Sequence, residues 1–482
     1  MFVLSAVLAA GILCFVLPAV HAQQAASLSP GVREFVEVSA PVVALTHARV
    51  IDGTGVAPRA DQTIIIADGK VRSIGDSATT PAPAGAQILD LTGKTVIPGL
   101  VGMHDHMFYP SGGRAAVAIY IEQGFSFPRL YLASGVTTIR TTGSIEPYTD
   151  LELKKLIDAG KLVGPKIHVT GPYLEGPGSF TPQMHELTGP DDARKLVDYW
   201  ADLGATSFKA YMHITRAELS AAVEEAHKRG IKVTGHLCSI GFKEAAALGI
   251  DNLEHGLMVD TEFDPHKTPD FCPSQRETAE TLAQTDVEAA PVQSTIRDLI
   301  EHHVAVTSTM PVFETFVPNR PPVEMRVLDA LSPEARISYL TIRAITSQDL
   351  TSPWPVLLKK EMQFDRDFVK AGGLLLAGED PTGYGGDLAG FGDQREVELL
   401  VEAGFSPVEA IRIATENGAK FLGEDDHIGT LSPGKAADLV VIDGDPSAKI
   451  EDMEKIEIVF KDGVGYDSAK LIDSVRGAVG LH

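Results

Sequence analysis

Cysteine is scarce in this sequence, and so is positive charge. Three cysteines in 482 residues cannot build a disulfide scaffold, which needs several cysteine pairs in a short chain. The 41 Lys and Arg residues are outnumbered by 65 Asp and Glu residues, which gives a formal net charge of −24 at pH 7. Nucleic acids and anionic membrane surfaces both attract basic proteins. The shortage of basic residues therefore argues against either as a partner.

Long apolar runs are also lacking, except at the N-terminus. Residues 1–20 are almost continuously apolar and uncharged, and Val20-His21-Ala22 is a small-x-small cleavage sequence. This pattern is typical of a secretory signal peptide cut after Ala22. It lacks the usual basic residue near its start, and an uncleaved anchor is the alternative. We expect a periplasmic or secreted protein, with no stable membrane insertion after cleavage. Export would permit a disulfide between Cys238 and Cys272, which the sequence alone leaves undecided.

The two ends of the mature chain have the same kind of sequence pattern. Residues 41–99 and 424–470 consist of short β-rich runs that are closed by turn signals, as in Asp438–Ile442 before Asp443-Gly444. They predict one small β-sandwich domain that is built from both chain ends. The overall content of 44% hydrophobic and 22% charged residues is ordinary for a globular protein. The length exceeds one ordinary domain but fits a large barrel with a smaller module.

Residues 100–423, between these ends, alternate β-type and α-type segments. Amphipathic helices are clearest at Thr215–Arg229 and Ile240–Leu248. The long connection from Phe313 to Lys370 is expected to be partly helical and to cover the active site. The eight predicted strands are Thr95–Met103, Gly135–Arg140, Lys166–Gly171, Ala205–Tyr211, Ile231–His236, Asp251–His255, Val304–Thr309 and Leu374–Asp380. They predict an α/β fold, a (β/α)8 TIM barrel whose active site lies at the C-terminal ends of the strands.

Polar side chains that suit a metal ion follow several of these strands. His104 and His106 come after the first strand, and residues two apart on a strand point to the same side. A His-x-His pair alone is weak, since about one would occur by chance in two such chains. The later strands end in Lys209, His236, His255 and Asp380. Imidazole and carboxylate groups are ligands for Zn²⁺ and related ions, so the sequence predicts a metal site at the barrel mouth.

These residues and three motifs resemble the amidohydrolase superfamily of metal-dependent barrel hydrolases. The motifs are Val96–Val101, Gly135–Thr138 and Ile428–Val440, and the resemblance extends from Val43 to about Gly463. The pattern is most similar to the imidazolonepropionase-like branch, which includes prolidase-type dipeptidases and ochratoxinase-like amidases. The resemblance therefore implies an enzyme that hydrolyses a C–N bond of a small amide, peptide or cyclic amide.

The resemblance also implies a role for each strand-end residue. It implies two divalent metal ions, with Zn²⁺ the expected ion, and a hydroxide between them that attacks the substrate. His104 and His106 match ligands of the first metal, His236 and His255 match ligands of the second, Lys209 matches a lysine that is carboxylated on its amine and bridges both, and Asp380 matches the aspartate that binds the first metal and moves the proton. An esterase, lactonase or phosphotriesterase on the same site, or an inactive binding scaffold, are the alternatives. The oligomeric state stays open, a homo-oligomer included.

Three further residues are candidates for contact with the substrate. Tyr211 and His213 closely follow Lys209 at the predicted mouth. Arg140, at the end of the second strand, either pairs with a substrate carboxylate or with a structural acid. Glu379 stands where the superfamily more usually has Thr, and we expect this departure to affect substrate choice rather than metal binding.

Overall fold

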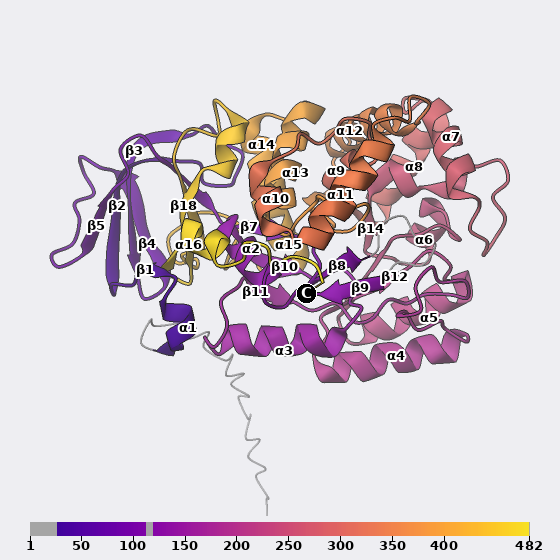
Figure 1. Cartoon of the computed structure of the whole chain (residues 1–482), viewed down its shortest axis with the longest axis horizontal. Helices are drawn as coiled ribbons and strands as arrows, with labels where there is room; N and C mark the ends of the chain where they lie inside the picture. Colours follow the sequence, from indigo (N-terminus) through magenta and orange to yellow (C-terminus); the bar gives the residue numbers. More distant parts are fainter. Residues whose placement is uncertain (1–26, 112–118, 482) are drawn as a thin grey trace, which may run out of the picture.

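Strands from both ends of the chain lie together in one sheet, at one end of the long axis of the molecule (Figure 1). The computed structural model describes residues 27–111 and 119–481, so the predicted signal peptide lies outside the described residues. The sheet contains β1 (Val36–Val38), β2 (Val42–Val50), β3 (Arg59–Ala67), β4 (Lys70–Asp76), β5 (Gln87–Asp90), β6 (Thr95–Pro98), β17 (Leu439–Ile442), β18 (Ile456–Lys461) and β19 (Val464–Asp467). The strand order is β1-β19-β18-β17-β6-β2-β3-β4, and β5 pairs with β2.

The junction between the two chain ends is the antiparallel pair of β6 and β17, in which Val440 lies opposite Ile97. Apolar side chains from both ends are buried together in a separate core, among them Val43, Leu45, Leu439 and Phe460. The two predicted segments do therefore share one sheet. The described strands of this region form a single sheet, and its classification as a β-sandwich stays a prediction.

The predicted alternating segment contains eight short parallel strands. They form two sheets in chain order, β11-β10-β7 and β12-β13-β14-β15-β16. At one junction the backbone N–H of Met103 donates to the carbonyl of Ala377, and at the other Thr206 donates to Val169, both at 2.8 Å. The strands are β7 (Leu100–Gly102), β10 (Val136–Arg140), β11 (Lys166–His168), β12 (Ser207–Ala210), β13 (Lys232–Gly235), β14 (Asn252–Glu254), β15 (Ala305–Ser308) and β16 (Leu375–Ala377).

One predicted strand is divided in the structure. Thr95–Met103 was expected to be continuous, but it forms β6 of the nine-stranded sheet and β7 of the parallel strands. The backbone explains the division, because neighbouring residues bond to different sheets. Gly99 donates to the carbonyl of Asp438, whereas Leu100 donates to that of Gly135. The sequence pattern could not show this, since the whole run is apolar and buried.

Helices separate successive strands and gather around them (Figure 1). The amphipathic segment 215–229 forms α5, which begins with a capping box between Thr215 and Glu218. None of the described helices combines the length and apolar character that crossing a bilayer requires. The helices are α1 (Pro30–Arg33), α2 (Phe127–Ala133), α3 (Pro147–Asp158), α4 (Pro190–Leu203), α5 (Arg216–Lys228), α6 (Phe242–Ala247), α7 (Gln275–Gln284), α8 (Ala290–Glu301), α9 (Met310–Glu314), α10 (Met325–Ala330), α11 (Pro333–Thr346), α12 (Trp354–Lys370), α13 (Phe391–Ala403), α14 (Pro407–Arg412), α15 (Gly418–Leu422) and α16 (Ser468–Asp473).

Two elements that interrupt this alternation contribute to the site. The hairpin of β8 (Phe108–Ser111) and β9 (Ile119–Glu122) follows the first parallel strand. The long connection after β15 is largely helical, as expected, and comprises α9 to α12. Its residues Phe313 and Trp354 line the central cavity. The connection therefore covers part of the site.

Candidate metal centre

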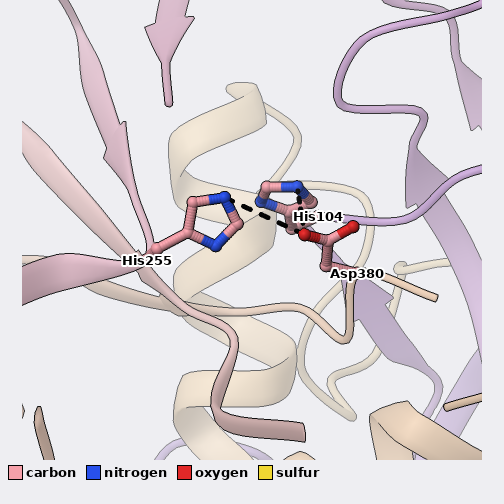
Figure 2. Close-up of side chains that lie close together, drawn as sticks. All are labelled: His104, His255 and Asp380. Carbon is pink, nitrogen blue, oxygen red and sulfur yellow. Dashed lines mark ion pairs between the residues drawn. The ribbon is translucent and has the colours of Figure 1, made fainter. Parts of the chain in front are cut away.

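The C-terminal ends of the parallel strands bring the predicted ligands together. Ligand atoms of His104, His255 and Asp380 all lie within 4.8 Å of one another, and the three side chains are buried. Nε2 of His104 is 3.6 Å from Oδ2 of Asp380, and Nε2 of His255 is 3.9 Å from the same oxygen. Figure 2 shows both rings directed at this carboxylate. Three different strand ends therefore supply one cluster.

The remaining predicted ligands surround these three. Nε2 of His106 lies 3.2 Å from Oδ1 of Asp380. The ring of His236 lies 4.4 Å from that of His255, measured between centroids. Nζ of Lys209 is 2.9 Å from Nε2 of His104. All six side chains proposed from the sequence thus meet at one place.

Hydrogen bonds to the far side of three of the rings orient these imidazoles. Nδ1 of His106 donates to the carbonyl of Gly143 at 3.1 Å, and Nδ1 of His104 lies 2.7 Å from the Glu254 carboxylate. Nδ1 of His255 lies 2.6 Å from the hydroxyl of Thr309. Such partners fix the tautomer of metal-binding histidines, because the nitrogen that carries the proton cannot be a ligand. The Nε2 atoms are therefore the ones presented to Asp380.

This arrangement fits a cation. Burial lowers the pKa of His106, which favours the neutral ring, and its proton sits on Nδ1 because the Gly143 carbonyl can only accept. The lone pair of Nε2 then faces a carboxylate oxygen, so two acceptors oppose one another. Nε2 of His255 is buried and has no hydrogen-bond partner among the described residues. A divalent ion between these atoms would satisfy all of them.

Backbone geometry supports a functional role for two of these residues. His255 and Asp380 have positive φ angles of 72° and 57°. Residues other than glycine rarely adopt this left-handed conformation, and it costs about 1–3 kcal/mol. His255 directly follows β14, and Asp380 lies three residues after the end of β16. The conformation lets the chain turn while each side chain stays in the cluster, and such strain is concentrated at functional sites.

Lys209 is an unusual lysine. Its side chain is almost completely buried, and within the described chain it forms no ion pair with a carboxylate. Burial lowers the pKa of its amine to about 8. The aromatic rings of Tyr173 and Tyr211 lie 5.4 and 5.7 Å from Nζ. A neutral amine is therefore accessible to Lys209 near physiological pH.

Asp380 is held in its ionised form. Burial alone would raise the pKa of this carboxyl group, but His104, His106 and Lys209 lower it well below its ordinary value. The side chain is 11% exposed, lines the cavity and accepts a hydrogen bond from Thr382. An ionised carboxylate at this place can bind a cation and accept a proton.

A second cluster consists of carboxylates alone. Ligand oxygens of Asp105, Glu379 and Asp393 lie within 4.8 Å of one another, and all three side chains are buried. Burial first, and then repulsion among neighbouring carboxylates, raises the pKa of Asp105 and Glu379, whereas the pKa of Asp393 is raised to about 7 mainly by burial. None of the three lines the cavity in the described chain. This carboxylate cluster therefore lies behind the metal centre, away from the cavity.

The metal centre opens into a cavity of about 940 Å³. His106, Lys209, His236, His255 and Asp380 form part of its wall. Most of the remaining wall is aromatic or aliphatic. This volume accommodates a small organic molecule, and ligand sites typically combine such apolar walls with a few polar groups.

The three candidates for substrate contact have different positions. Tyr211 lines the cavity, with its ring 5.0 Å from that of His236. His213 also lines it and is half-buried, and a hydrogen bond to Glu175 raises its pKa. Both are therefore placed where a substrate would lie.

Arg140 is placed differently from the other two. It is buried, and its Nη2 donates to Glu254 at 2.8 Å and to Asn252 at 2.7 Å. It is not among the described residues that line the cavity. Of the two alternatives, the structure shows the pairing with a structural acid. A substrate-binding role for Arg140 is not supported, because its donors are engaged away from the cavity.

The sequence pattern did not point to Glu254, whose carboxylate links Arg140 to His104. One carboxylate oxygen accepts from Arg140, and the other accepts from His104. The residue precedes His255 on β14, and alternation along a strand would place it on the opposite side. Only the position of the neighbouring strands, which the sequence does not reveal, brings it behind His104. Its acidic character within a buried strand was the available signal.

A disulfide joins Cys238 and Cys272. Cys238 lies two residues after His236, and Cys272 immediately precedes the segment that leads into α7. Both cysteines line the cavity. The disulfide therefore attaches the segment around residue 272 to the strand end that carries a predicted metal ligand.

Comparison with known proteins agrees with this geometry. The chain matches imidazolonepropionase from Halobacterium salinarum with 30% identity over 105 residues, which is 21% of this chain and only 25% of that relative. The fold is similar to a Xaa-Pro dipeptidase crystallised with methionine in its active site, with 21% identity, a TM-score of 0.66 and coverage of 88% of this chain and 100% of that one.

It is also similar to bottromycin amidohydrolase, with 21% identity, a TM-score of 0.67 and coverage of 95% and 98% of the two chains. The model of the amidohydrolase family matches residues 95–464. This range contains all six residues of the metal centre and most of the described chain. The protein therefore belongs to the amidohydrolase family.

Proposed function

We propose that this protein is an exported metal-dependent hydrolase that cleaves a C–N bond of a small amide, peptide or cyclic amide. The observation that carries the proposal is the convergence of four imidazoles, Lys209 and Asp380 in one cluster, five of whose six side chains line one cavity. Membership of the amidohydrolase family and similarity to a dipeptidase and an amidohydrolase support the same class of reaction. In this proposal the eight parallel strands form a (β/α)8 barrel, and residues 41–99 and 424–470 form the β-sandwich domain.

The site is proposed to hold two divalent ions, with Zn²⁺ the expected metal. His104, His106 and Asp380 would bind the first ion, and His236 and His255 the second. Bound metal ions would supply a water molecule that is nucleophilic near neutral pH and would polarise the scissile carbonyl. Asp380 would accept the proton of that water and transfer it to the leaving nitrogen. Its ionised state and its place at the cavity wall support this role.

Lys209 is proposed to be carboxylated on its amine and to bridge the two ions. Only a neutral amine reacts with CO₂, and burial favours the neutral form of this lysine. This reaction gives the side chain a negative charge, which would balance part of the charge of the two cations. Four neutral imidazole ligands alone would not supply that charge. Loss of metal from Lys209→Ala, with partial recovery by added short carboxylates, would support the bridge. A retained metal content in that variant would contradict it.

Export is proposed from the apolar residues 1–20 and the cleavage sequence that ends at Ala22. The disulfide between Cys238 and Cys272 supports it, because disulfides persist in oxidising compartments such as the periplasm or the extracellular space. N-terminal sequencing of the protein from culture medium and periplasm should begin at Gln23. A protein that retains Met1 and sediments with membranes would favour the uncleaved anchor instead.

The activity is tested with the purified full-length mature chain. Elemental analysis should give close to two equivalents of divalent metal, and a chelator should abolish amide hydrolysis until metal is restored. His236→Ala should lose about one equivalent, whereas His302→Ala, a control on an exposed histidine at the end of α8, should lose none. One equivalent in the wild type, unchanged in His236→Ala, would overturn the binuclear assignment.

The same purified protein also distinguishes amide hydrolysis from the alternative functions. N-acyl amides, dipeptides, aryl esters and lactones are assayed in parallel at equal metal loading. Faster turnover of esters or lactones than of any amide would favour the esterase or lactonase alternative. Failure to retain metal under any condition would favour an inactive binding scaffold.

A further inference from the structure

Two groups of aromatic side chains contact different histidines of the metal centre. The first, here called the tyrosine wall, comprises Phe108, Tyr120, Tyr173, Phe180 and Tyr211. The second, here called the tryptophan wall, comprises Phe313, Phe316, Trp354 and Tyr384. Every one of these nine side chains lines the cavity. The two walls come from different parts of the chain, and the first contacts His106 and His236 whereas the second contacts His255.

The tyrosine wall is a connected set of rings. Phe108 stacks on the ring of His106 with a centroid distance of 4.4 Å, and Tyr211 lies 5.0 Å from His236. Tyr120 lies 5.1 Å from Phe108 and 6.1 Å from Phe180. These rings are carried by the β8–β9 hairpin and by the segments that follow β11 and β12. The wall therefore extends outward from His106 and His236.

The tryptophan wall extends from another histidine. Phe313 lies 5.4 Å from the ring of His255 and stacks on Trp354 at 5.6 Å. Phe316 lies 4.8 Å from Trp354 and 4.5 Å from Tyr384. These rings come from the long helical connection and from the loop after β16. The second wall is thus built mostly by the long helical connection, with Tyr384 added from the loop after β16.

Away from the metal centre, positively charged side chains are scarce around this cavity. Within the described part of the chain, no arginine lines it, and Lys209 is its one lysine. Of the four histidines among these lining residues, three belong to the metal centre, and the fourth, His213, is engaged by Glu175. Burying a carboxylate against apolar walls without a partner costs several kcal/mol. The described walls therefore favour neutral groups over charged ones.

We propose that the cavity has two apolar subsites, one on each aromatic wall, and that the preferred substrate is an amide with a bulky, uncharged group on both sides of the scissile C–N bond. The proposal rests on the proposed amide hydrolysis at this site and names its substrate class. Each wall contacts at least one histidine of the same metal centre. A scissile bond held at that centre therefore lies within reach of both walls. Small, polar or carboxylate-bearing groups gain little from either wall.

A grid of nine amides tests the substrate class. The acyl group is phenylacetyl, acetyl or succinyl, and the amine is phenethylamine, methylamine or β-alanine. We expect kcat/KM to be highest for the doubly aromatic amide. It should fall by about tenfold or more when either aromatic group is removed, in keeping with discrimination in apolar pockets. Succinyl and β-alanine amides should be poorer still. Equal or better turnover of either carboxylate series would overturn the proposal.

Variants assign one wall to each side of the bond. Trp354→Ala should abolish the preference for an aromatic group on one side, and Tyr120→Ala should abolish it on the other. Trp354→Phe and Tyr120→Phe retain a ring and should restore most of the preference. Tyr199→Ala removes a half-exposed tyrosine on α4 and should change neither. Loss of both preferences in each single variant would overturn the assignment of two subsites.

Fluorescence separates this proposal from the proposed reaction. The chain has two tryptophans, and Trp200→Phe leaves Trp354 as the sole reporter. Titration with the doubly aromatic amide should change its emission at lower concentration than titration with the succinyl or β-alanine amides. Such binding without turnover of any amide would support the apolar subsites and contradict amide hydrolysis. Turnover of amides without any difference in binding or rate among them would support amide hydrolysis and contradict the apolar subsites.

Discussion

The metal centre and the carboxylate cluster are neighbours in sequence but opposites in chemistry. His104 and His106 belong to the metal centre, whereas Asp105 between them belongs to the carboxylate cluster. Asp380 and Glu379 divide in the same way. The pKa of Asp380 is lowered by His104, His106 and Lys209, whereas burial and neighbouring acids raise that of Glu379. A shift of one position along a strand end therefore decides whether a carboxylate joins the metal centre or the carboxylate cluster.

The comparison shows that burial alone does not make a functional carboxylate. Asp380 is the carboxylate proposed to act in catalysis, because it lines the cavity and lies beside the imidazoles of the metal centre. Glu379, Asp105 and Asp393 are equally buried but have no opening to the cavity in the described chain. Burial raises the pKa of all three, and neighbouring carboxylates raise it further for Asp105 and Glu379. Substitutions in the two clusters should therefore have different consequences, which the following predictions separate.

The largest effect is expected from Asp380→Asn. The variant keeps the size and one oxygen of the side chain but cannot accept a proton. We expect metal content to fall modestly and kcat to fall by about 10²–10⁴, the usual contribution of general acid–base catalysis. The acidic limb of the pH–rate profile should also disappear. A fully metallated variant with kcat within a factor of about three of wild type would assign proton transfer to another residue, and Glu379→Gln would then be the next test.

Next in size is the effect of Glu254→Gln, which removes the charge that holds His104 and Arg140. The amide presents one oxygen where the carboxylate presents two, so one of these partners loses its acceptor. Loss of such a supporting acid typically reduces metal affinity or activity about 10–100-fold. Metal titration of the apoprotein measures it. An unchanged metal affinity would show that the orientation of His104 is fixed by other contacts.

A smaller effect is expected from opening the disulfide. Cys272→Ser should release the segment before α7 from the end of β13, because Cys272 is joined to Cys238 two residues after His236. We expect KM for the aromatic amides to rise a few-fold, while the bound metal stays near the wild-type amount. Treatment of the wild type with a reductant should reproduce the change, and should have no effect on the variant. Loss of metal in the variant would show that the disulfide supports the ligands directly.

Strand ends and alternation were enough to predict which six side chains converge, but not what surrounds them. His104, His106, Lys209, His236, His255 and Asp380 are each read from one strand at a time, and the barrel pattern then brings the ends together. Glu254 and Asp393 depend on which strands and helices pack side by side, which no local pattern states. The aromatic walls depend on the course of the connections after the strands, and these are the parts that pattern reasoning describes least.

The smallest effect on activity is expected from Asp393→Asn, which tests the carboxylate cluster by stability. In the unfolded chain this carboxyl loses its proton near pH 4, whereas in the folded protein it retains it to about pH 7. Between these two pH values, unfolding releases a proton from Asp393. The free energy of unfolding therefore falls as the pH rises, by at most about 4 kcal/mol in total. The amide cannot ionise. The melting temperature of the variant, relative to wild type, should therefore rise between pH 5 and pH 8, with kcat nearly unchanged. A relative melting temperature that falls over this range would mean that the ionised cluster is stabilised, as a bound cation would do.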